Sequence, residues 1–394
     1  MQSAAMNVEG AVVLSRKGEE RVLRGHPWVF RSDVARAGDA PAGGVVSVAG
    51  PRGRALGFAL HSTRSEIRLR MIERAPELSP TWLRDRLAGA IGWRETVAAG
   101  ARACRLVHGE GDRLPSLVVD RYGDHLAIQT LSQGTERLKE AIVTILVDLL
   151  KPTGILERND PRVRTLEGLD AKVGLLYGEV PETVEVDEGG IVFEADLWKG
   201  QKTGLFLDQR ENHIAARQYA RGRVLDGFAY TGGFALQVAR AAEQVIAVDL
   251  SGEALERLRG NAARNGLVNV ETRDANVFDL LRDLHDRGER FGTVILDPPA
   301  FAKSKDAVAK ARRGYKEINL RALKILEPGG CLITCSCSYH VHESDLEGIL
   351  ADAAVDAGAT VAVVEKRRQA RDHPVVLGVP ETYYLKCFVL RKLA

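Results

Sequence analysis

The apolar residues of the C-terminal half come in short runs that alternate with stretches of helical spacing. Five of these runs are expected to be strands: 223–226, 244–249, 269–273, 293–297 and 330–335. Amphipathic stretches such as 253–265 and 315–327 separate them and are expected to be helices. This alternation predicts an α/β fold with a parallel, doubly wound sheet.

The first 74 residues follow another pattern, with short apolar runs separated by Gly and Pro and no long helical period. The expected strands are 11–14, 44–48, 56–60 and 67–71. Short strands with turn residues between them indicate a small β-barrel.

Residues 75–197 combine both patterns. Helices are expected at 81–99, where Ser79 and Pro80 provide a cap and a first-turn proline, and at 135–150. Strand-like runs, the last two joined by a hairpin turn at 187–189, lie at 116–120, 125–129, 183–186 and 190–195. We therefore predict three domains: a β-barrel at 1–74, a small α+β domain at 75–197 and the α/β domain at 198–394.

The composition narrows the class of protein. The 394 residues are 45% hydrophobic and 27% charged, which is typical of a globular protein with two or three cores. The apolar stretch 141–150 is too short to span a bilayer, and no secretory signal follows the first Met. We expect a cytoplasmic protein. Because the net charge is only +2, any surface for nucleic acid must be a local basic face.

The cysteine spacing gives no metal site and no disulfide framework. No CxxC pair and no zinc-like His spacing accompany the five cysteines at 104, 331, 335, 337 and 387. Free cysteines are commonly small buried hydrophobic residues, and we expect this of Cys104, Cys331, Cys335 and Cys387.

Residues 224–236 contain a strand, a Gly-rich turn and the start of a helix. Gly232 and Gly233 allow a ligand to approach the backbone closely. The spacing differs from GxGxxG, which argues against a pyrophosphate-binding dehydrogenase.

Acidic residues end three successive predicted strands, at Asp226, Asp249 and Asp274. Asp249 is suited to accept both hydroxyls of a ribose, and Asp274 to accept an adenine amino group. Each aspartate alone is more often a helix cap or a loop residue. Three of them in register favour a ligand site, because ligands of open α/β sheets bind at the carboxyl ends of the strands.

Two further motifs bear on the chemistry: Asp297-Pro298-Pro299 within 296–301, and the cysteine-containing run 334–338. A DPP turn after an apolar strand suits a flat nitrogen heterocycle, whose edge Asp297 would bind while Phe301 stacks on its face. Cys337, at the end of the next strand, is a candidate nucleophile for such a ring. His340 and His342 are either proton carriers or exposed loop residues.

The N-terminal segment 21–31 places arginines beside two aromatic residues. One interpretation is an RNA-contacting turn in which guanidinium groups hold phosphates and a ring stacks on a base. The other is that Trp28 and Phe30 belong to the barrel core while the arginines are solvated. The residues alone leave both open.

The motifs of the α/β domain resemble those of class I S-adenosylmethionine (AdoMet)-dependent methyltransferases, which have a Rossmann-like sheet. The resemblance implies AdoMet as cofactor and extends to 202–210, which otherwise reads as a linker and helix cap. The cofactor-binding residues that it implies are Asp208, Gln209, Arg210, Asp226, Phe228, Tyr230, Thr231, Gly232, Gly233, Asp249, Leu250, Asp274, Ala275 and Pro298.

Taken whole, the chain resembles the bacterial 23S rRNA 5-methylcytosine methyltransferases of the large-subunit methyltransferase I type. The matching segments are 25–30, 158–160, 167–169, 202–210, 297–301, 336–338 and 368–374. The resemblance implies a PUA-like RNA-binding domain and a 23S rRNA substrate. The sequence leaves open whether the chain forms a homodimer. It implies Cys337 and Asp297 as catalytic residues, and the substrate-binding residues Arg24, His26, Trp28, Pro299 and Phe301.

One position departs from the wider group of RNA 5-methylcytosine enzymes. Many of these carry a second cysteine just after the DP dipeptide, where this chain has Ala300. The base for the last step is therefore open. Two other functions also remain: methylation of an exocyclic amine on an RNA purine, and a non-catalytic role in ribosome assembly.

Overall fold

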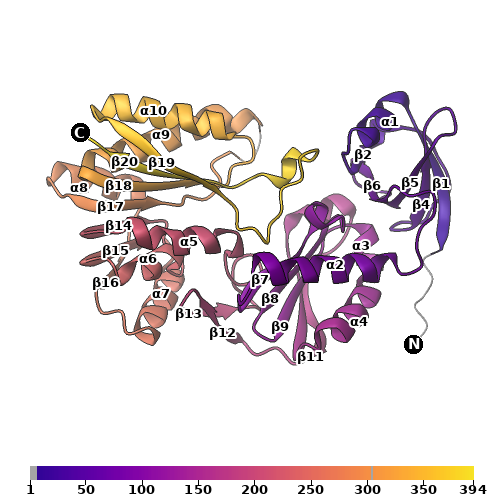
Figure 1. The fold of residues 1–394 in the computed structure, drawn as a ribbon, viewed down its shortest axis with the longest axis horizontal. Coiled ribbons are helices and arrows are strands. Elements are labelled where there is room, and N and C mark those ends of the chain that lie inside the picture. The colour runs from indigo at the N-terminus through magenta and orange to yellow at the C-terminus, as the bar shows by residue number, and fades with distance from the viewer. Residues whose placement is uncertain (1–6, 303–304) are drawn as a thin grey trace. The chain divides into compact units, whose positions relative to one another are not determined.

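The computed structural model describes residues 7–302 and 305–394, which form two compact units (Figure 1). The first unit contains the described residues up to 186 together with 195–205 and 371–382. The second contains 187–194, 206–370 and 383–394. None of the helices in these described residues combines the length and apolar character needed to cross a bilayer.

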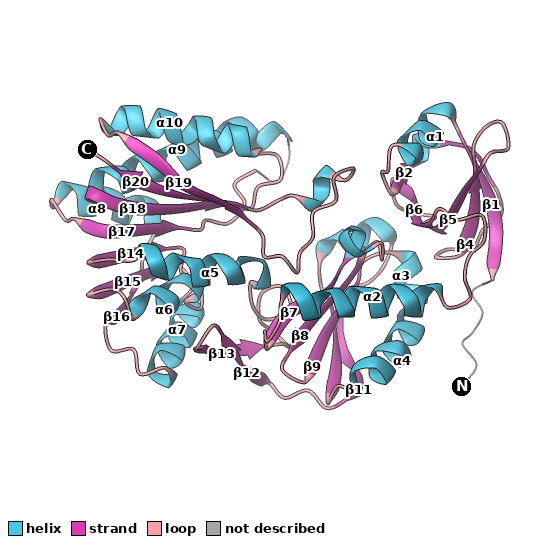
Figure 2. Cartoon of the chain, viewed as in Figure 1, coloured by secondary structure: helices cyan, strands magenta, loops and turns pink. Residues whose placement is uncertain are grey.

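The N-terminal part of the first unit is a six-stranded sheet in the order β2-β6-β5-β4-β1-β3, which curves around its own apolar core (Figure 2). Its strands are β1 (Val8–Leu14), β2 (Trp28–Phe30), β3 (Val34–Ala37), β4 (Val45–Ala49), β5 (Ala55–His61) and β6 (Ile67–Glu73). The four predicted strands lie within β1, β4, β5 and β6. The prediction included no helix in this part of the chain, but the short helix α1 (Arg16–Leu23) follows β1. This helix buries only Gly18 and Val22, too few residues for a visible helical period.

The segment 21–31 is not a single turn. Its first residues finish α1, and Trp28 to Phe30 form β2. The side chain that enters the core is Val29, whereas Trp28 and Phe30 are half-buried. The interpretation that both aromatic residues fill the core was therefore wrong, because β2 turns only its middle residue inward.

The rest of the first unit has a five-stranded sheet in the order β11-β10-β9-β8-β7. Its elements are α2 (Trp82–Val97), β7 (Ala103–His108), β8 (Leu117–Tyr122), β9 (His125–Thr130), α3 (Gln133–Arg137), α4 (Lys139–Leu150), β10 (Gly154–Asn159) and β11 (Lys172–Gly178). Strands β7, β10 and β11 were not predicted. The helix predicted at 135–150 is divided at Leu138. The predicted cap at Ser79 was wrong, because the N-cap residue of α2 is Thr81, so Pro80 lies before the first turn.

The hairpin of β12 (Thr183–Glu188) and β13 (Ile191–Asp196) turns one residue later than predicted. Gly189 and Gly190 form the turn, with φ angles of +62° and +86°. A two-residue hairpin turn whose twist matches that of the strands requires two successive residues with positive φ. Glycine adopts this conformation without a steric penalty.

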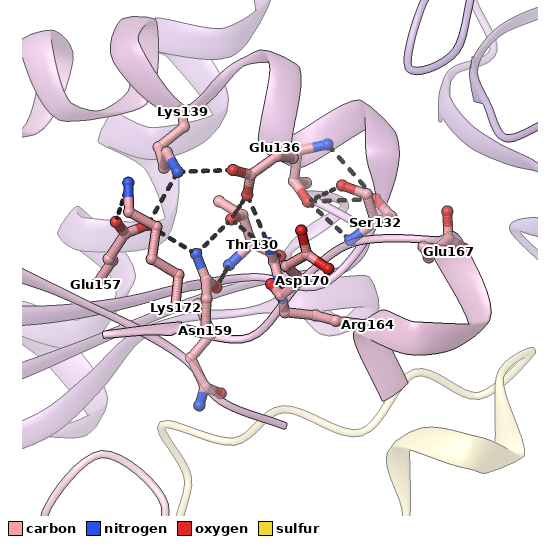
Figure 3. A network of polar contacts seen from close by, with 12 residues as sticks. Thr130, Ser132, Glu136, Lys139, Glu157, Asn159, Arg164, Glu167, Asp170 and Lys172 are labelled. Atoms are coloured by element: carbon pink, nitrogen blue, oxygen red, sulfur yellow. Dashed lines mark hydrogen bonds and ion pairs between the residues drawn. The ribbon is translucent and has the colours of Figure 1, made fainter. Parts of the chain in front are cut away.

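A network of charged and polar side chains links α3, α4, β10 and β11 (Figure 3). Lys139 Nζ donates to Glu136 Oε1 at 2.7 Å and to Glu157 Oε2 at 2.9 Å. Arg164 Nη1 donates to Glu136 Oε2 at 2.9 Å, and Lys172 pairs with Glu157 at 2.9 Å. Burial alone raises the pKa of Glu136, but hydrogen bonds from Lys139 and its other neighbours outweigh burial and lower that pKa to about 2.

The second unit has a seven-stranded sheet in the order β16-β15-β14-β17-β18-β20-β19. Its strands are β14 (Arg223–Gly227), β15 (Gln244–Asp249), β16 (Val270–Asp274), β17 (Phe291–Leu296), β18 (Leu326–Ser336), β19 (Val361–Arg368) and β20 (Lys386–Lys392). The five predicted strands are present and parallel, which confirms the α/β class. Strands β19 and β20 were not predicted, and they pair antiparallel at one edge, so the sheet is mixed.

Helices cover both faces of this sheet (Figure 2). On one face, a large apolar core includes residues of the last three helices, α8 (Val277–Asp286), α9 (Val308–Ile325) and α10 (Glu343–Ala357). The other helices, which lie on the opposite face, are α5 (Arg210–Ala216), α6 (Gly233–Ala239) and α7 (Gly252–Arg264). Helices on both faces explain why the central parallel strands β14, β15 and β17 are largely buried, whereas β16 at the edge of the sheet is not.

Candidate functional site

The parallel strands of the second unit deliver four aspartates to one edge of the sheet. Asp226 lies at the penultimate position of β14, Asp249 and Asp274 end β15 and β16, and Asp297 follows β17. Asp249 pairs with Asp274 in the strand register, and the residues beside Asp226 and Asp297 are also register partners. The carboxyl ends of parallel strands are where ligands of open α/β sheets bind.

The turn after β14 has an unusual backbone. Phe228 and Tyr230 have positive φ angles of +69° and +48°, and Gly232 has +95°. The Asp249 carboxylate holds this turn by accepting a hydrogen bond from the Tyr230 amide at 2.9 Å, and its other oxygen accepts one from the Ser251 amide at 2.9 Å. Left-handed non-glycine residues cost free energy and commonly occur at functional sites.

Gly233 has a packing role that the sequence did not reveal. A Cβ atom on this residue would lie 2.4 Å from the ring of His213 in α5. His213 Nδ1 in turn contacts Glu188 Oε1 at 2.8 Å. The glycine therefore lets α6 approach α5 closely, while Gly232 provides the left-handed residue before the helix.

Asp226 is a buried carboxylate without a hydrogen bond to either oxygen from the described residues. Only 1% of the surface of Asp226 is exposed to solvent. Burial raises its pKa well above the ordinary value, the nearby charge of Asp297 adds to that effect, and an interaction with the Ala235 backbone opposes it only in part. A buried polar group normally has a partner, so this carboxylate suits a ligand that brings N–H donors or a positive charge.

The other predicted cofactor residues differ in exposure. Leu250 is 67% exposed, Asp274 is exposed and Ala275 is half-buried, with the Ala275 amide donating to Asp249 O at 3.2 Å. Thr231 is buried, and its carbonyl accepts a hydrogen bond from Asn261. An exposed leucine beside carboxylates offers an apolar face to a flat ring.

Asp208, Gln209 and Arg210 are buried at the start of α5. Tyr384 Oη donates to Asp208 Oδ2 at 2.9 Å, and the Asp208 carbonyl accepts from the Ala370 amide at 2.8 Å. This segment is therefore tied to the strand region around β19 and β20. Residues 208–210 are an integrated part of the second unit, whereas 202–205 belong to the first unit.

The turn after β17 presents its residues to different surroundings. Pro298 is buried and Pro299 is exposed. Phe301 packs on Tyr315 with ring centroids 4.6 Å apart and on Phe278 at 6.0 Å. Part of the Phe301 ring surface is thus used in packing, which leaves Pro299 as the exposed residue of the DPP motif.

Cys337 lies beside this turn. It directly follows β18, is half-buried, and its Sγ is 3.9 Å from the carbonyl oxygen of Pro298. The structure therefore brings together the two motifs that the sequence places 39 residues apart. All five cysteines are free of disulfides, and the four others are buried, as expected: Cys104, Cys331, Cys335 and Cys387.

Lys386 is the residue that sequence reasoning missed. It pairs with Ser336 in the ladder of β18 and β20 and is only 2% exposed. Its Nζ donates to Ser338 O at 2.8 Å and to Tyr384 O at 3.0 Å. Burial lowers its pKa to about 8, although the charge of Cys337 opposes this effect. The available signal was a lysine inside the apolar run 385–390.

The remaining candidates have structural contacts of their own. His342 is the residue before α10, and its backbone amide donates a hydrogen bond to Asp345 Oδ2 at 3.0 Å in a capping box. The ring of His340 packs on the ring of Tyr339. In the first unit, Trp28 Nε1 donates to Glu110 Oε1 at 2.8 Å, and His26 Nε2 contacts Glu381 Oε2 at 3.2 Å.

Arg24 is exposed in the first unit. No cluster of His, Cys, Asp and Glu within 7–302 and 305–394 has the geometry to hold a metal ion.

Two family models match the chain. Residues 12–74 match a PUA-like domain, and residues 163–388 match the S-adenosylmethionine-dependent methyltransferase model. Proteins named Ribosomal RNA large subunit methyltransferase I match over nearly the full length. The relative from Shigella boydii is 40% identical over 390 residues, covering 96% of this chain and 98% of its own. The relative from Tolumonas auensis is 40% identical over 393 residues, covering 97% and 99%.

Solved structures share the fold. A Streptococcus mutans protein that carries the name of a SAM-dependent methyltransferase superposes with a TM-score of 0.82 at 21% identity, covering 97% of this chain and 99% of its own. A methyltransferase structure in complex with SAH has the same TM-score and coverage at 22% identity.

The AdoMet assignment agrees with the site itself. AdoMet carries an ammonium group, which a buried carboxylate without hydrogen-bond donors can bind, and a ribose and an adenine that match the acidic strand ends. The family models, the near full-length relatives and this edge of the sheet agree. The chain belongs to the ribosomal RNA large subunit methyltransferase I family of AdoMet-dependent methyltransferases.

Proposed function

We propose that this chain methylates carbon 5 of a cytosine in 23S ribosomal RNA, with Cys337 as the nucleophile and Asp297 orienting the base. The observation that carries the proposal is the position of Cys337 Sγ, 3.9 Å from the Pro298 carbonyl of the DPP turn. The relatives' name supports ribosomal RNA of the large subunit as the substrate. We infer that this RNA is methylated in the cytoplasm.

The chemistry requires a nucleophile at this position. Carbon 5 of a cytosine is a poor nucleophile, and addition of the Cys337 thiolate to carbon 6 makes it enamine-like. Carbon 5 then takes the methyl group. Loss of the carbon 5 proton to a base returns an electron pair to the ring, and the carbon–sulfur bond breaks to restore the thiolate. Since Ala300 replaces the second cysteine, that base is another group or water.

The cofactor roles are part of the same proposal. AdoMet, when bound, supplies a methyl group activated by a sulfonium. Asp226 would bind the ammonium group, Asp249 the ribose hydroxyls, and Asp274 with Ala275 the adenine. Leu250 would cover a face of the adenine, because it is a large apolar side chain that is 67% exposed at this edge.

The remaining predicted cofactor residues form the walls of the same site in this proposal. They are Asp208, Gln209, Arg210, Phe228, Tyr230, Thr231, Gly232, Gly233 and Pro298. The positive φ angles in the turn after β14 support it, since they turn backbone groups toward a ligand at the sheet edge.

We assign RNA binding to the first two of three domains, with the boundaries 1–74, 75–197 and 198–394. The match of 12–74 to a PUA-like domain supports this division. Exposed Arg24 suits a phosphate, and His26 and Trp28 lie next to it in sequence. Pro299 and Phe301 would contact the target base after it is unstacked from its helix, which costs a few kcal/mol.

The test is methylation with labelled AdoMet of ribosomal RNA that lacks the modification, followed by digestion and chromatography of the nucleosides. We expect labelled 5-methylcytidine from the wild type and at least ~10³-fold slower turnover for Cys337→Ala, with unchanged AdoMet affinity. Cys331→Ala, a buried cysteine of β18, is the matched control and should stay active.

Three results would contradict the proposal. Full activity of Cys337→Ala would exclude the covalent mechanism. A labelled methylpurine would instead indicate methylation of an exocyclic amine through the DPP turn. A wild type that binds AdoMet and ribosomal RNA without any transfer would indicate a non-catalytic assembly role.

A further inference from the structure

A buried ammonium group lies next to the segment that carries Cys337. Lys386 begins β20 and faces Ser336, the last residue of β18, in the antiparallel ladder. Its two hydrogen bonds go to carbonyl oxygens, those of Ser338 and Tyr384. The cation is therefore bound to the residue that directly follows the thiol.

The carboxylates nearest to this lysine are engaged elsewhere. Asp345 pairs with Arg312 at 2.8 Å, and Glu343 accepts a hydrogen bond from Tyr383 at 2.6 Å and lies 3.4 Å from Lys366. None of the ion pairs within the described part of the chain includes Lys386. A buried charge without an ionic partner is costly, so its retention calls for a reason.

The residues on both sides of Cys337 are held in place. Ser336 Oγ donates to Tyr315 Oη at 2.9 Å, and Ser338 Oγ contacts the same Tyr315 oxygen at 2.9 Å. The Ala302 amide donates to Ser338 Oγ at 3.2 Å, which ties this segment to the end of the DPP loop. Lys386 adds the only positive charge among these contacts.

We propose that Lys386 is a positioning residue that stabilises the Cys337 thiolate and fixes the Cys337–Ser338 segment against β20. The inference rests on the proposed role of Cys337 as nucleophile. A thiolate, not a thiol, attacks carbon, and a nearby cation favours the thiolate. The thiol proton leaves to solvent, and at pH 7, below its own pKa of about 8, Lys386 keeps its proton.

The pH dependence of thiol alkylation tests this directly. The full-length protein is treated with iodoacetamide over pH 6–10 without AdoMet, and modification of Cys337 is followed by peptide mass spectrometry. Relative to the wild type, we expect Lys386→Met and Lys386→Gln to raise the midpoint by ~1 pH unit and to slow alkylation at pH 7 roughly tenfold. Lys386→Arg, which keeps the charge, should restore much of the effect.

The chain offers a matched control. Lys392 lies on the same strand and also donates to two carbonyl oxygens, those of Leu323 at 2.9 Å and Leu326 at 2.8 Å. Lys392→Met removes an equivalent pair of hydrogen bonds and should leave the Cys337 midpoint unchanged. Comparison with this variant separates loss of charge from loss of structure.

An unchanged midpoint in a folded Lys386→Gln or Lys386→Met protein would overturn the inference, as would an equal shift in Lys392→Met. If the neutral variants do not fold, Lys386→Arg decides: a wild-type midpoint supports a role for charge, and a raised midpoint opposes it. The outcome is independent of methylation. A shifted midpoint in an enzyme that makes no 5-methylcytidine would refute the proposed function alone.

Discussion

Buried charges in the two units are treated in opposite ways. In the first unit, Lys139 lies between Glu136 and Glu157, and Arg164 closes the network from the other side (Figure 3). Hydrogen bonds there lower the pKa of Glu136 against the opposing effect of burial, and they raise that of Lys139. Each group is therefore held in its charged form.

At the carboxyl edge of the second unit's sheet, burial of the charged groups outweighs the interactions that oppose it. Burial raises the pKa of Asp226 and lowers that of Lys386 to about 8, so both shift toward the neutral form. Charges that are paired with one another stabilise the folded structure. A buried charge whose partners do not offset its burial can instead interact with a ligand or a reacting group. The contrast between the two regions gives three predictions about stability and AdoMet affinity.

Loss of a central member of the paired network should have the largest effect on stability. Arg164→Met removes a buried guanidinium that donates to Glu136 Oε2, Asp170 O and Thr130 O. Glu136 Oε2 keeps its hydrogen bond from Thr130 Oγ1, but it loses the positive charge of Arg164. We expect the free energy of unfolding to fall by about 3–5 kcal/mol in urea denaturation. The AdoMet affinity of the folded fraction should not change. Lys172→Met, at the exposed end of the same network, is the control and should cost less than about 1 kcal/mol.

Substitution of the buried carboxylate Asp226 should lower the AdoMet affinity without lowering the stability of the protein. Asp226→Asn keeps the shape of the side chain but removes its charge, so we expect AdoMet to bind about 10–100-fold more weakly in calorimetry. The melting temperature without cofactor should not fall, because no existing hydrogen bond is lost.

Asp120→Asn is the matched control, since Asp120 is equally buried but binds Arg105 through both oxygens at 2.8 Å. It should lower stability and leave AdoMet affinity unchanged. If Asp226→Asn bound AdoMet as tightly as the wild type, the proposed role of the unpaired carboxylate would be wrong.

A smaller effect should appear in the pH dependence of stability, with opposite signs for the two regions. The pKa of Glu136 is lowered from 4.5 to about 2 on folding. Its contribution is therefore complete above pH 4.5 and lost as pH falls toward 2. We expect the stability difference between the wild type and Glu136→Gln to shrink by about 1–2 kcal/mol over that range, allowing for solvent screening.

Asp226 should show the reverse sign because its pKa is raised on folding. As pH rises above its unfolded value of 3.8, the unfolded state loses the proton first, and the wild type becomes less stable relative to Asp226→Asn. Urea titrations of the cofactor-free proteins from pH 3 to pH 7 measure both differences. Slopes of the same sign would contradict the contrast between the two regions.

Local patterns were sufficient where an element is buried on both faces or ends in a distinctive motif. Four of the five parallel strands of the second unit, β14, β15, β17 and β18, were predicted from runs rich in Val, Ile and Leu, which are typical of such strands. The fifth, β16, has no such run and was predicted from its place in the alternation of strands and helices. The family and cofactor followed from the spacing of these motifs. The individual binding roles remain predictions.

The missed elements lack such patterns. The residues of β11 and β19 are largely exposed or half-buried, and α1 has only eight residues. Lys386 was not predicted as a site residue because the sequence does not show which strand its own strand pairs with. Without that pairing, the neighbours of a charged residue in an apolar run are unknown. That pairing joins β20 to a strand that ends 50 residues earlier in the chain.

The sequence alone determined the class of fold, the edge of the sheet where acidic residues gather, and Cys337 as the candidate nucleophile, because strand periodicity and motif order are local properties. Only the tertiary structure decided that Cys337 meets the DPP turn, that neither oxygen of the buried Asp226 carboxylate accepts a hydrogen bond of good geometry from the described residues, and that Lys386 binds the carbonyl of the residue after the thiol. These depend on which strands become neighbours and how deeply each group is buried, and both are set by packing across the whole unit.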